Sequence, residues 1–144
     1  MLKTIPPLLT PDALHALASM GHGDELVIAD ANFPAARIAA AGGARLVQLP
    51  GADAPQVLRA VLHLLPLDSF GPVAAWTMQV VGDNGFVPPP VVQFAQVLAD
   101  SGEQPAQPLE RFAFYERAQR AFAVFRSGEQ RSYGNIILRK GVVN

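Results

Sequence analysis

Apolar residues recur along the chain with two different spacings, which predict helices and strands in turn. Apolar positions three and four residues apart, with prolines and capping residues near the ends, are typical of amphipathic helices. The helices expected in this way cover residues 11–20, 53–65, 88–100 and 112–119. Short continuous apolar runs predict strands over residues 25–29, 45–49, 73–81, 121–126 and 133–139. Because helices and strands alternate, we expect a layered α/β domain.

The composition is consistent with one folded domain over residues 1–144. Half of the residues are apolar and only 16% are charged, so the chain has ample material for a core. A chain of this length has a large surface to solvate, and so low a charged fraction leaves part of that surface apolar. We therefore expect the protein to form a homo-oligomer.

The charge and the missing residue types exclude several classes of function. The net charge is −1 and Lys and Arg do not cluster, so we expect no nucleic-acid partner. The chain has no cysteine, which excludes disulfides, thiolate nucleophiles and cysteine-based metal sites. We find no signal-peptide pattern and no apolar run of about 18 residues. We therefore expect a soluble, cytoplasmic protein with no membrane partner.

Motifs for metals, phosphates and nucleophiles are also missing. His15, His22 and His63 do not have the spacing of metal ligands, so we expect no metal site. The glycine-rich stretches at 21–24 and 41–44 do not match a phosphate-binding loop, and no G-x-S-x-G nucleophile motif occurs. We expect no cofactor, and acid–base chemistry remains as the possibility to examine.

The segment MGHGDELVIADANFP, residues 20–34, offers candidates for that chemistry. His22 lies between two glycines, and Asp30 follows the strand expected over residues 25–29. Ligands of open α/β sheets gather at the carboxyl ends of strands, and imidazole is the usual proton carrier at neutral pH. The structural alternative is that His22 and Asp30 only cap a helix and a turn.

The last third of the chain supplies side chains suited to a sugar. Arg111, Tyr115, Tyr133 and Asn135 carry donors and acceptors that hydrogen-bond hydroxyl groups. The aromatic faces of Trp76, Phe33 and Tyr115 are suited to packing on the C–H face of a sugar ring. The structural alternative is that residues 111–119 form an amphipathic helix with a solvated charged face.

Five stretches carry a resemblance to a known family. They are MLKTIPPLLTP at 1–11, MGHGDELVIADANFP at 20–34, LPLDSFGP at 65–72, RFAFYERAQRAFAVFRSGE at 111–129 and YGNIILRKGV at 133–142. The chain resembles the bacterial fucose mutarotase and ribose pyranase family, and its fucose branch most closely. The resemblance implies a three-layer α/β/α domain and a ring-shaped oligomer, a decamer, with sites at subunit contacts. It further implies that the YGN segment of one chain completes the pocket of a neighbour.

The resemblance also implies an activity, the interconversion of the α and β anomers of a free monosaccharide without cofactor or metal. By motif match, His22 is the proton donor. The residues expected to contact the sugar are Asp30, Arg111, Tyr133, Gly134 and Asn135. We hypothesise that Asp30 orients His22 or binds a hydroxyl, and that Tyr133 acts as the acid or the base.

The chain departs from the family pattern at three places. The fucose branch usually has DAHFP where this chain has DANFP, and Asn32 carries no proton at neutral pH. Residues 35–50 are rich in Ala and Gly and longer than expected, and Trp76 replaces a smaller residue. L-fucose is therefore the first choice of sugar, while another deoxyhexose, a hexose or ribose stays open. A non-catalytic sugar-binding or transport-accessory protein is the alternative function.

Overall fold

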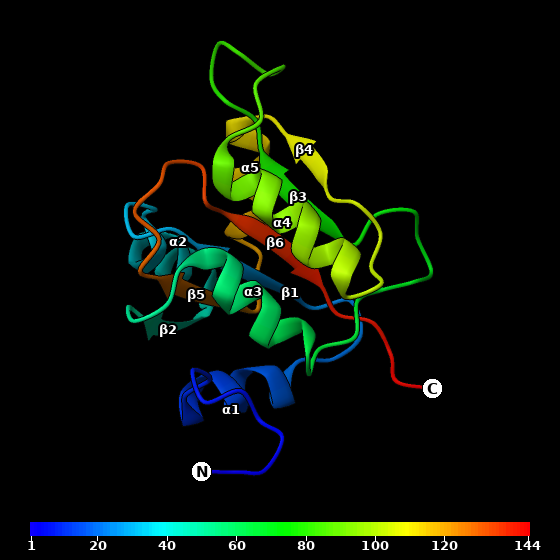
Figure 1. Cartoon of the computed structure of the whole chain (residues 1–144). Coiled ribbons are helices and arrows are strands. Elements are labelled where there is room, and N and C mark those ends of the chain that lie inside the picture. The colour runs from blue at the N-terminus through cyan, green and yellow to red at the C-terminus, as the bar shows by residue number, and fades with distance from the viewer.

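The computed structural model describes all 144 residues and consists of one six-stranded sheet between two layers of helices (Figure 1). The helices are α1 (Pro11–Ser19), α2 (Ala35–Gly42), α3 (Ala54–Leu62), α4 (Pro89–Asp100) and α5 (Arg111–Ala118). The strands are β1 (Glu25–Ala29), β2 (Arg45–Leu49), β3 (Ala75–Met78), β4 (Gln107–Leu109), β5 (Ala123–Ser127) and β6 (Ile136–Arg139). The α/β class predicted from the sequence is confirmed.

The strand order is β2-β5-β1-β6-β3-β4, and β6 alone runs antiparallel to its neighbours. The register places Ile28 opposite Ile136 and Glu25 opposite Arg139. The carboxyl ends of β1 and β3 therefore share one edge of the sheet with the beginning of β6. The loops that leave this edge bring segments 30–34 and 132–135 together.

Both faces of the sheet are covered, which is why β1 is apolar at successive positions. Leu26 and Ile28 pack into the larger core with α1, α3 and α4. Val27 and Ala29 point to the opposite face and pack with α2 and α5. Side chains alternate along a strand, so a strand buried on both faces needs an unbroken apolar run. The predicted three-layer arrangement is confirmed.

Two elements were missed by the sequence analysis. No helix was expected within residues 35–50, but α2 forms there because alanine is the strongest helix former and Gly43, at φ 70°, ends the helix. β4 lies between the helices expected over residues 88–100 and 112–119, where no strand was predicted. It is a three-residue edge strand parallel to β3, and its Pro108 is tolerated because an edge strand can leave one side unpaired.

The strand ends also differ from the prediction. The strand expected over residues 73–81 is limited to β3, and the strand expected over 133–139 begins only at Ile136. Tyr133 has φ 63°, a left-handed conformation that is incompatible with a strand. Residues 133–135 therefore make no strand hydrogen bonds of β6 and form a loop at the edge of the sheet.

None of the five helices is both long and apolar enough to cross a membrane.

Candidate active site at the edge of the sheet

A pocket of about 270 Å³ opens where β1 and β3 end and β6 begins. We call it the edge pocket. Its lining residues are Asp30, Asn32, Phe33, Met78, Arg111, Tyr115, Ser132, Tyr133 and Asn135. Three separate segments therefore bring together six residues that the sequence analysis named for the site: Asp30, Phe33, Arg111, Tyr115, Tyr133 and Asn135. Met78 and Ser132 were missed, and nothing in their sequence context marks them.

Asp30 and Asn135 form a reciprocal hydrogen-bonded pair at the base of the pocket. The Asp30 backbone N–H donates to Asn135 Oδ1 (2.8 Å), and Asn135 Nδ2 donates to Asp30 Oδ2 (3.0 Å). Asp30 Oδ1 accepts the backbone N–H groups of Asn32 (3.0 Å) and Phe33 (2.8 Å). The Asp30 residue is only 4% exposed. Burial raises the pKa of Asp30, and these hydrogen bonds oppose the increase without cancelling it.

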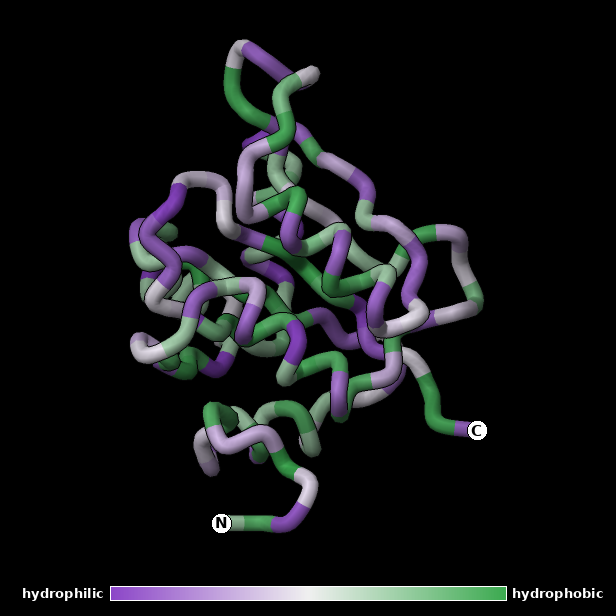
Figure 2. Tube along the Cα trace, viewed as in Figure 1, coloured by the Kyte–Doolittle hydropathy of each residue, from purple (hydrophilic) through white to green (hydrophobic).

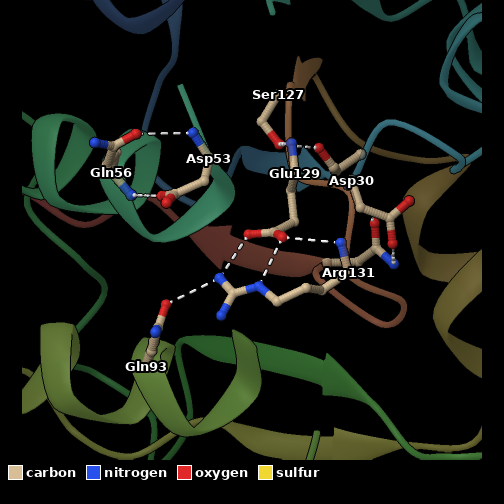
Figure 3. A network of polar contacts seen from close by, with 9 residues as sticks. Asp30, Asp53, Gln56, Gln93, Ser127, Glu129 and Arg131 are labelled. Carbon is tan, nitrogen blue, oxygen red and sulfur yellow. Dashed lines mark hydrogen bonds and ion pairs between the residues drawn. The ribbon is translucent and has the colours of Figure 1, made fainter. Parts of the chain in front are cut away.

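An ion pair between the buried Glu129 carboxylate and the partly exposed Arg131 side chain braces the loop that precedes β6 (Figure 3). The Glu129 carboxylate accepts from Arg131 Nε and Nη2, both at 2.9 Å, and from the Arg131 backbone N–H at 3.0 Å. These bonds lower the pKa of Glu129 against the effect of its burial. The Arg131 guanidinium continues to Gln93 Oε1 on α4 (3.0 Å), so the loop before β6 is tied to the helix layer.

Gly134 lies between this brace and Asp30. A Cβ atom at Gly134 would lie 2.6 Å from Glu129 Cγ and 3.4 Å from Asp30 Cβ. The Gly134 backbone also opposes the rise in the pKa of Asp30. The predicted role of Gly134 at the site is therefore compatible with its place, because only a residue without a side chain lets this backbone lie so close to Glu129.

Aromatic side chains form one wall of the pocket. Phe33 stacks on Tyr115 with ring centroids 5.5 Å apart. The Tyr133 hydroxyl accepts the backbone N–H of Val81 (3.1 Å), which fixes the phenol despite the left-handed backbone beneath it. A non-glycine residue held at positive φ is a strained feature that is common at functional sites.

Arg111 is the unsatisfied group of the pocket. It is the first residue of α5, and the Glu110 side chain caps that helix by accepting the backbone N–H groups of Phe112 and Ala113. Its guanidinium lies 4.7 Å from the Phe112 ring centroid, and its Nε is buried without a hydrogen-bond partner. A buried donor without an acceptor is costly, so the pocket is suited to a ligand that brings an oxygen to Arg111.

His22 does not contact Asp30 within the chain, so the predicted pairing is wrong for a single chain. The two residues lie beyond opposite ends of β1, whose five residues span roughly 17 Å at the usual rise of a strand. His22 Nε2 instead lies 3.3 Å from Asp68 Oδ1, and its ring centroid is 5.3 Å from that of Phe70. Sequence spacing gave no sign of a partner 46 residues away.

Trp76 is also absent from the pocket, which corrects its predicted contact with the sugar. Its side chain is 4% exposed and packs in the core between the guanidinium groups of Arg117, at 3.4 Å from the ring centroid, and Arg139, at 5.0 Å. Met78 lies two residues further along β3, on the same face, and reaches the pocket instead.

The YGN segment contributes to the pocket of its own chain, where Tyr133 and Asn135 lie beside Asp30. Its predicted contribution to the pocket of a neighbouring chain stays a prediction.

A larger groove, of about 670 Å³, lies between the N-terminal segment, α3 and α4. Its lining includes charged and titratable side chains, but each already has a partner within the fold: Asp53 caps α3, Arg59 pairs with Asp100, and His63 Nε2 lies 3.1 Å from the Thr4 carbonyl. Chemistry on a hydroxylated substrate is better served by the edge pocket, despite its smaller volume.

Comparison with known proteins places the chain in a family. Residues 3–143 match the RbsD / FucU transport protein family. The chain belongs to this family. The fucose mutarotase of Bos taurus is 45% identical over 146 aligned residues, which cover 99% of this chain and 95% of the relative. The family resemblance stated from the sequence motifs is thereby confirmed.

Two solved structures extend the comparison. The fucose mutarotase of Streptococcus pneumoniae in complex with L-fucose has a TM-score of 0.91 and 39% identity, over 99% of this chain and all of that chain. The Bacillus subtilis RbsD complexed with D-ribose has a TM-score of 0.76 and 23% identity over the whole of both chains, and it shows the shared fold alone.

Proposed function

We propose that this protein is a sugar mutarotase that interconverts the α and β anomers of L-fucose. The observation that carries the proposal is the edge pocket, where a buried carboxylate, an unpaired guanidinium N–H and a phenol converge. The similarity to fucose mutarotases over nearly the whole chain, including the L-fucose complex, supports L-fucose as the sugar. No residue of the pocket needs a cofactor for this chemistry.

The chemistry requires two proton movements. One proton leaves the anomeric hydroxyl and another reaches the ring oxygen, so that the bond between the anomeric carbon and the ring oxygen breaks. The aldehyde then rotates, and the ring recloses with both proton movements reversed. Positioned proton transfer of this kind contributes about 10²- to 10⁴-fold in rate.

Each pocket residue has a role in the proposal. Arg111 and Asn135 hold sugar oxygens, and Asp30 Oδ2 accepts a sugar hydroxyl. Tyr133 is the acid or base within the chain, because its hydroxyl accepts the Val81 N–H and keeps its own proton available for a sugar oxygen. The face of the stacked Phe33 and Tyr115 pair packs against the sugar's C–H groups.

We further propose that His22 reaches the edge pocket from a neighbouring copy of the chain. Exposed apolar side chains surround the two separated parts of the site. Val81, Phe86, Val87 and Phe112 are exposed on the pocket side, and Phe70 is exposed beside His22. The loop with Val81, Phe86 and Val87 projects from the body of the molecule, with its apolar residues in green (Figure 2). Exposed apolar surface of this kind marks protein contacts.

Contact between two different surfaces of identical chains is heterologous and closes into a ring when the rotation permits. The proposed assembly is therefore a ring, and we propose the decamer that the family resemblance implies. Light scattering of the purified protein gives its mass in solution, and a monomer at assay concentration would exclude a shared site.

Exchange NMR on L-fucose tests the activity, because it reports the α–β interconversion rate at the anomeric protons. We expect faster exchange with the protein than without it, and less acceleration for D-ribose, D-galactose and L-rhamnose. His22→Ala should remove most of the acceleration, whereas His15→Ala, at an exposed position on α1, should retain it. Unchanged exchange in a correctly assembled His22→Ala protein would exclude His22 from the chemistry.

Mixed oligomers test the shared site. His22→Ala and Tyr133→Phe each damage every site of a uniform oligomer. Dissociated and reassembled together, they form some sites with both residues intact, so exchange should return in the mixture and in neither variant alone. A site formed by one chain gives no recovery.

The alternative function is sugar binding without catalysis. It is favoured by one observation, that the edge pocket of a single chain contains no imidazole, with Asn32 where the fucose branch usually has His. Binding of L-fucose without faster exchange would support this alternative, and Asn32→His is then the first variant to examine.

A further inference from the structure

We propose that Asp68 is the positioning residue of His22, which it holds by hydrogen bond and charge in the orientation needed for proton transfer. The inference rests on the proposed function, because it assumes that His22 takes part in anomer exchange. It concerns a residue at the opposite edge of the sheet from the edge pocket, in the segment LPLDSFGP at 65–72.

The geometry is that of a histidine held by a carboxylate. Asp68 Oδ1 lies 3.3 Å from His22 Nε2, and the side chains are 9% and 48% exposed respectively. An ionised carboxylate only accepts hydrogen bonds, so the contact assigns the imidazole proton to Nε2. The other nitrogen, Nδ1, makes no hydrogen bond within the chain and is available to a substrate. A carboxylate in this position fixes the tautomer of the ring and stabilises its protonated form.

The carboxylate is itself held from two directions. The Phe70 backbone N–H donates to Asp68 Oδ1 at 3.1 Å, which closes a tight turn, and Arg139 Nε lies 3.4 Å from Asp68 Oδ2. Arg139 is anchored by a hydrogen bond from Nη2 to the Val73 carbonyl (2.8 Å) and by the Trp76 ring beneath it. Asp68 is thus held by Arg139 of β6 and by the Phe70 backbone of its own loop, independently of its contact with His22.

The same turn places an aromatic ring on the imidazole. Phe70 is 74% exposed and its ring is inclined by 57° to that of His22. His22 is consequently confined by Asp68 on its edge and by Phe70 on its face. Proton transfer requires the imidazole to be held in one orientation, and these two contacts restrict the orientation of an otherwise solvent-exposed ring.

Other charged groups lie near His22 and Asp68 and bear on any pH-dependent measurement of this pair. Arg139 pairs with Asp68 directly, while Asp24 accepts the Gly21 N–H in the loop that carries His22. Lys140 follows Arg139 on the chain, and its carbonyl accepts the Gly23 N–H. The Phe70 N–H, with lesser contributions from His22 and Arg139, lowers the pKa of Asp68, so its carboxylate stays ionised throughout the range in which a histidine titrates.

Asp68→Asn is the informative variant, because asparagine keeps the turn and the shape while it removes the charge. We expect the maximal exchange rate on L-fucose to fall about 10- to 100-fold, with L-fucose binding changed by less than about twofold. We also expect the acid side of the pH–rate profile to move, because the charged ring has lost its counter-ion. Asp100→Asn, which removes an exposed carboxylate paired with Arg59, is the matched control and should leave both unchanged.

A double variant separates positioning from general structural damage. If Asp68 acts through His22, then Asp68→Asn should add little to His22→Ala, because the group to be positioned is already gone. An unchanged rate in Asp68→Asn, or a loss of rate with an unchanged pH profile and weaker sugar binding, overturns the inference. Full activity of His22→Ala is a different failure, since it refutes the role of His22 in the proposed function itself.

Discussion

Asn135 and Asp30, 105 residues apart in the chain, hydrogen-bond each other twice, and each acts once as donor and once as acceptor. The pair joins the end of β1 to the beginning of β6 and thereby holds together the two segments that form the edge pocket. Both residues are almost fully buried, at 3% and 4% exposure. A buried polar pair of this kind specifies geometry because neither partner has water as a substitute.

Replacement of Asn135 by Ala should lower both stability and activity. The Asp30 N–H and Oδ2 lose their partner, and each buried unsatisfied group costs roughly 1–3 kcal/mol. We expect the free energy of unfolding, measured by denaturant titration, to fall by about 2–4 kcal/mol. L-fucose exchange should fall with it, because Asn135 also holds the sugar in the proposed site. Gln104→Ala, at an exposed position before β4, is the control and should leave both quantities unchanged.

The pH dependence of stability should report the burial of Asp30. Since its pKa is raised in the folded protein, the folded state binds this proton more tightly than the unfolded chain does. The stability advantage of the wild type over Asp30→Asn should therefore be largest at low pH. It should decline as pH rises from the ordinary value of 3.8 through the raised folded pKa.

Asp68→Asn provides a control of opposite sign for that experiment. Its pKa is lowered by the Phe70 N–H, His22 and Arg139, so the contribution of its carboxylate to stability is present above the ordinary value and is lost as pH falls below it. The comparison uses denaturant titrations of the wild type, Asp30→Asn and Asp68→Asn between about pH 3 and pH 7. This range brackets the ordinary pKa values of carboxyl groups. A wild-type advantage over Asp30→Asn that grows with pH contradicts the raised pKa.

The sequence was informative about local structure and about the kind of chemistry, and less so about which residues meet. The run 25–29 predicts β1 at its observed bounds because a strand buried on both faces has a distinctive pattern. Asp30, Arg111, Tyr115, Tyr133 and Asn135 were all named in advance, since their side chains suit a hydroxylated ligand and match family motifs.

The sequence did not predict which distant residues contact each other, or which side chains are buried beneath others. The pairing of His22 with Asp30 followed from closeness in sequence, but the intervening strand carries the two residues apart. Trp76 was expected at the sugar because its aromatic face suits the C–H face of a sugar ring. Arg117 and Arg139 cover it, and their positions depend on α5 and β6 being packed against β3. The helix at α2 was missed because an Ala- and Gly-rich segment has no clear apolar period.

Gly134→Ala should force the Gly134 backbone and Glu129 apart. The added Cβ would lie 2.6 Å from Glu129 Cγ, and Glu129 cannot yield easily because three hydrogen bonds from Arg131 hold its carboxylate. Overpacking of this kind costs about 1–3 kcal/mol. We expect that loss in denaturant titration together with slower L-fucose exchange. Gly51→Ala, where an added Cβ has nothing within 4 Å, should be neutral in both measurements.

Arg111→Met should separate binding from stability. The terminal methyl of methionine takes the place of Nε, so the variant keeps the apolar length of the side chain and removes its unpaired donor. Hydrogen bonds to charged groups are worth about 1.5–3 kcal/mol, which predicts L-fucose binding weaker by at least about tenfold in calorimetry. The free energy of unfolding should be unchanged or higher, because the folded protein no longer buries a polar group without a partner.

The matched control for Arg111 is Arg120→Met. Arg120 lies just beyond the same helix, pairs with Glu116 at an exposed position, and should tolerate the change with no effect on L-fucose binding. A large loss of stability in Arg111→Met would mean that its guanidinium supports the fold. The unpaired Nε would then have to be explained without the sugar. If Arg111 serves the ligand, sugar binding should weaken while stability is undiminished. The cost of burying its Nε is then offset only when a sugar oxygen accepts a hydrogen bond from it.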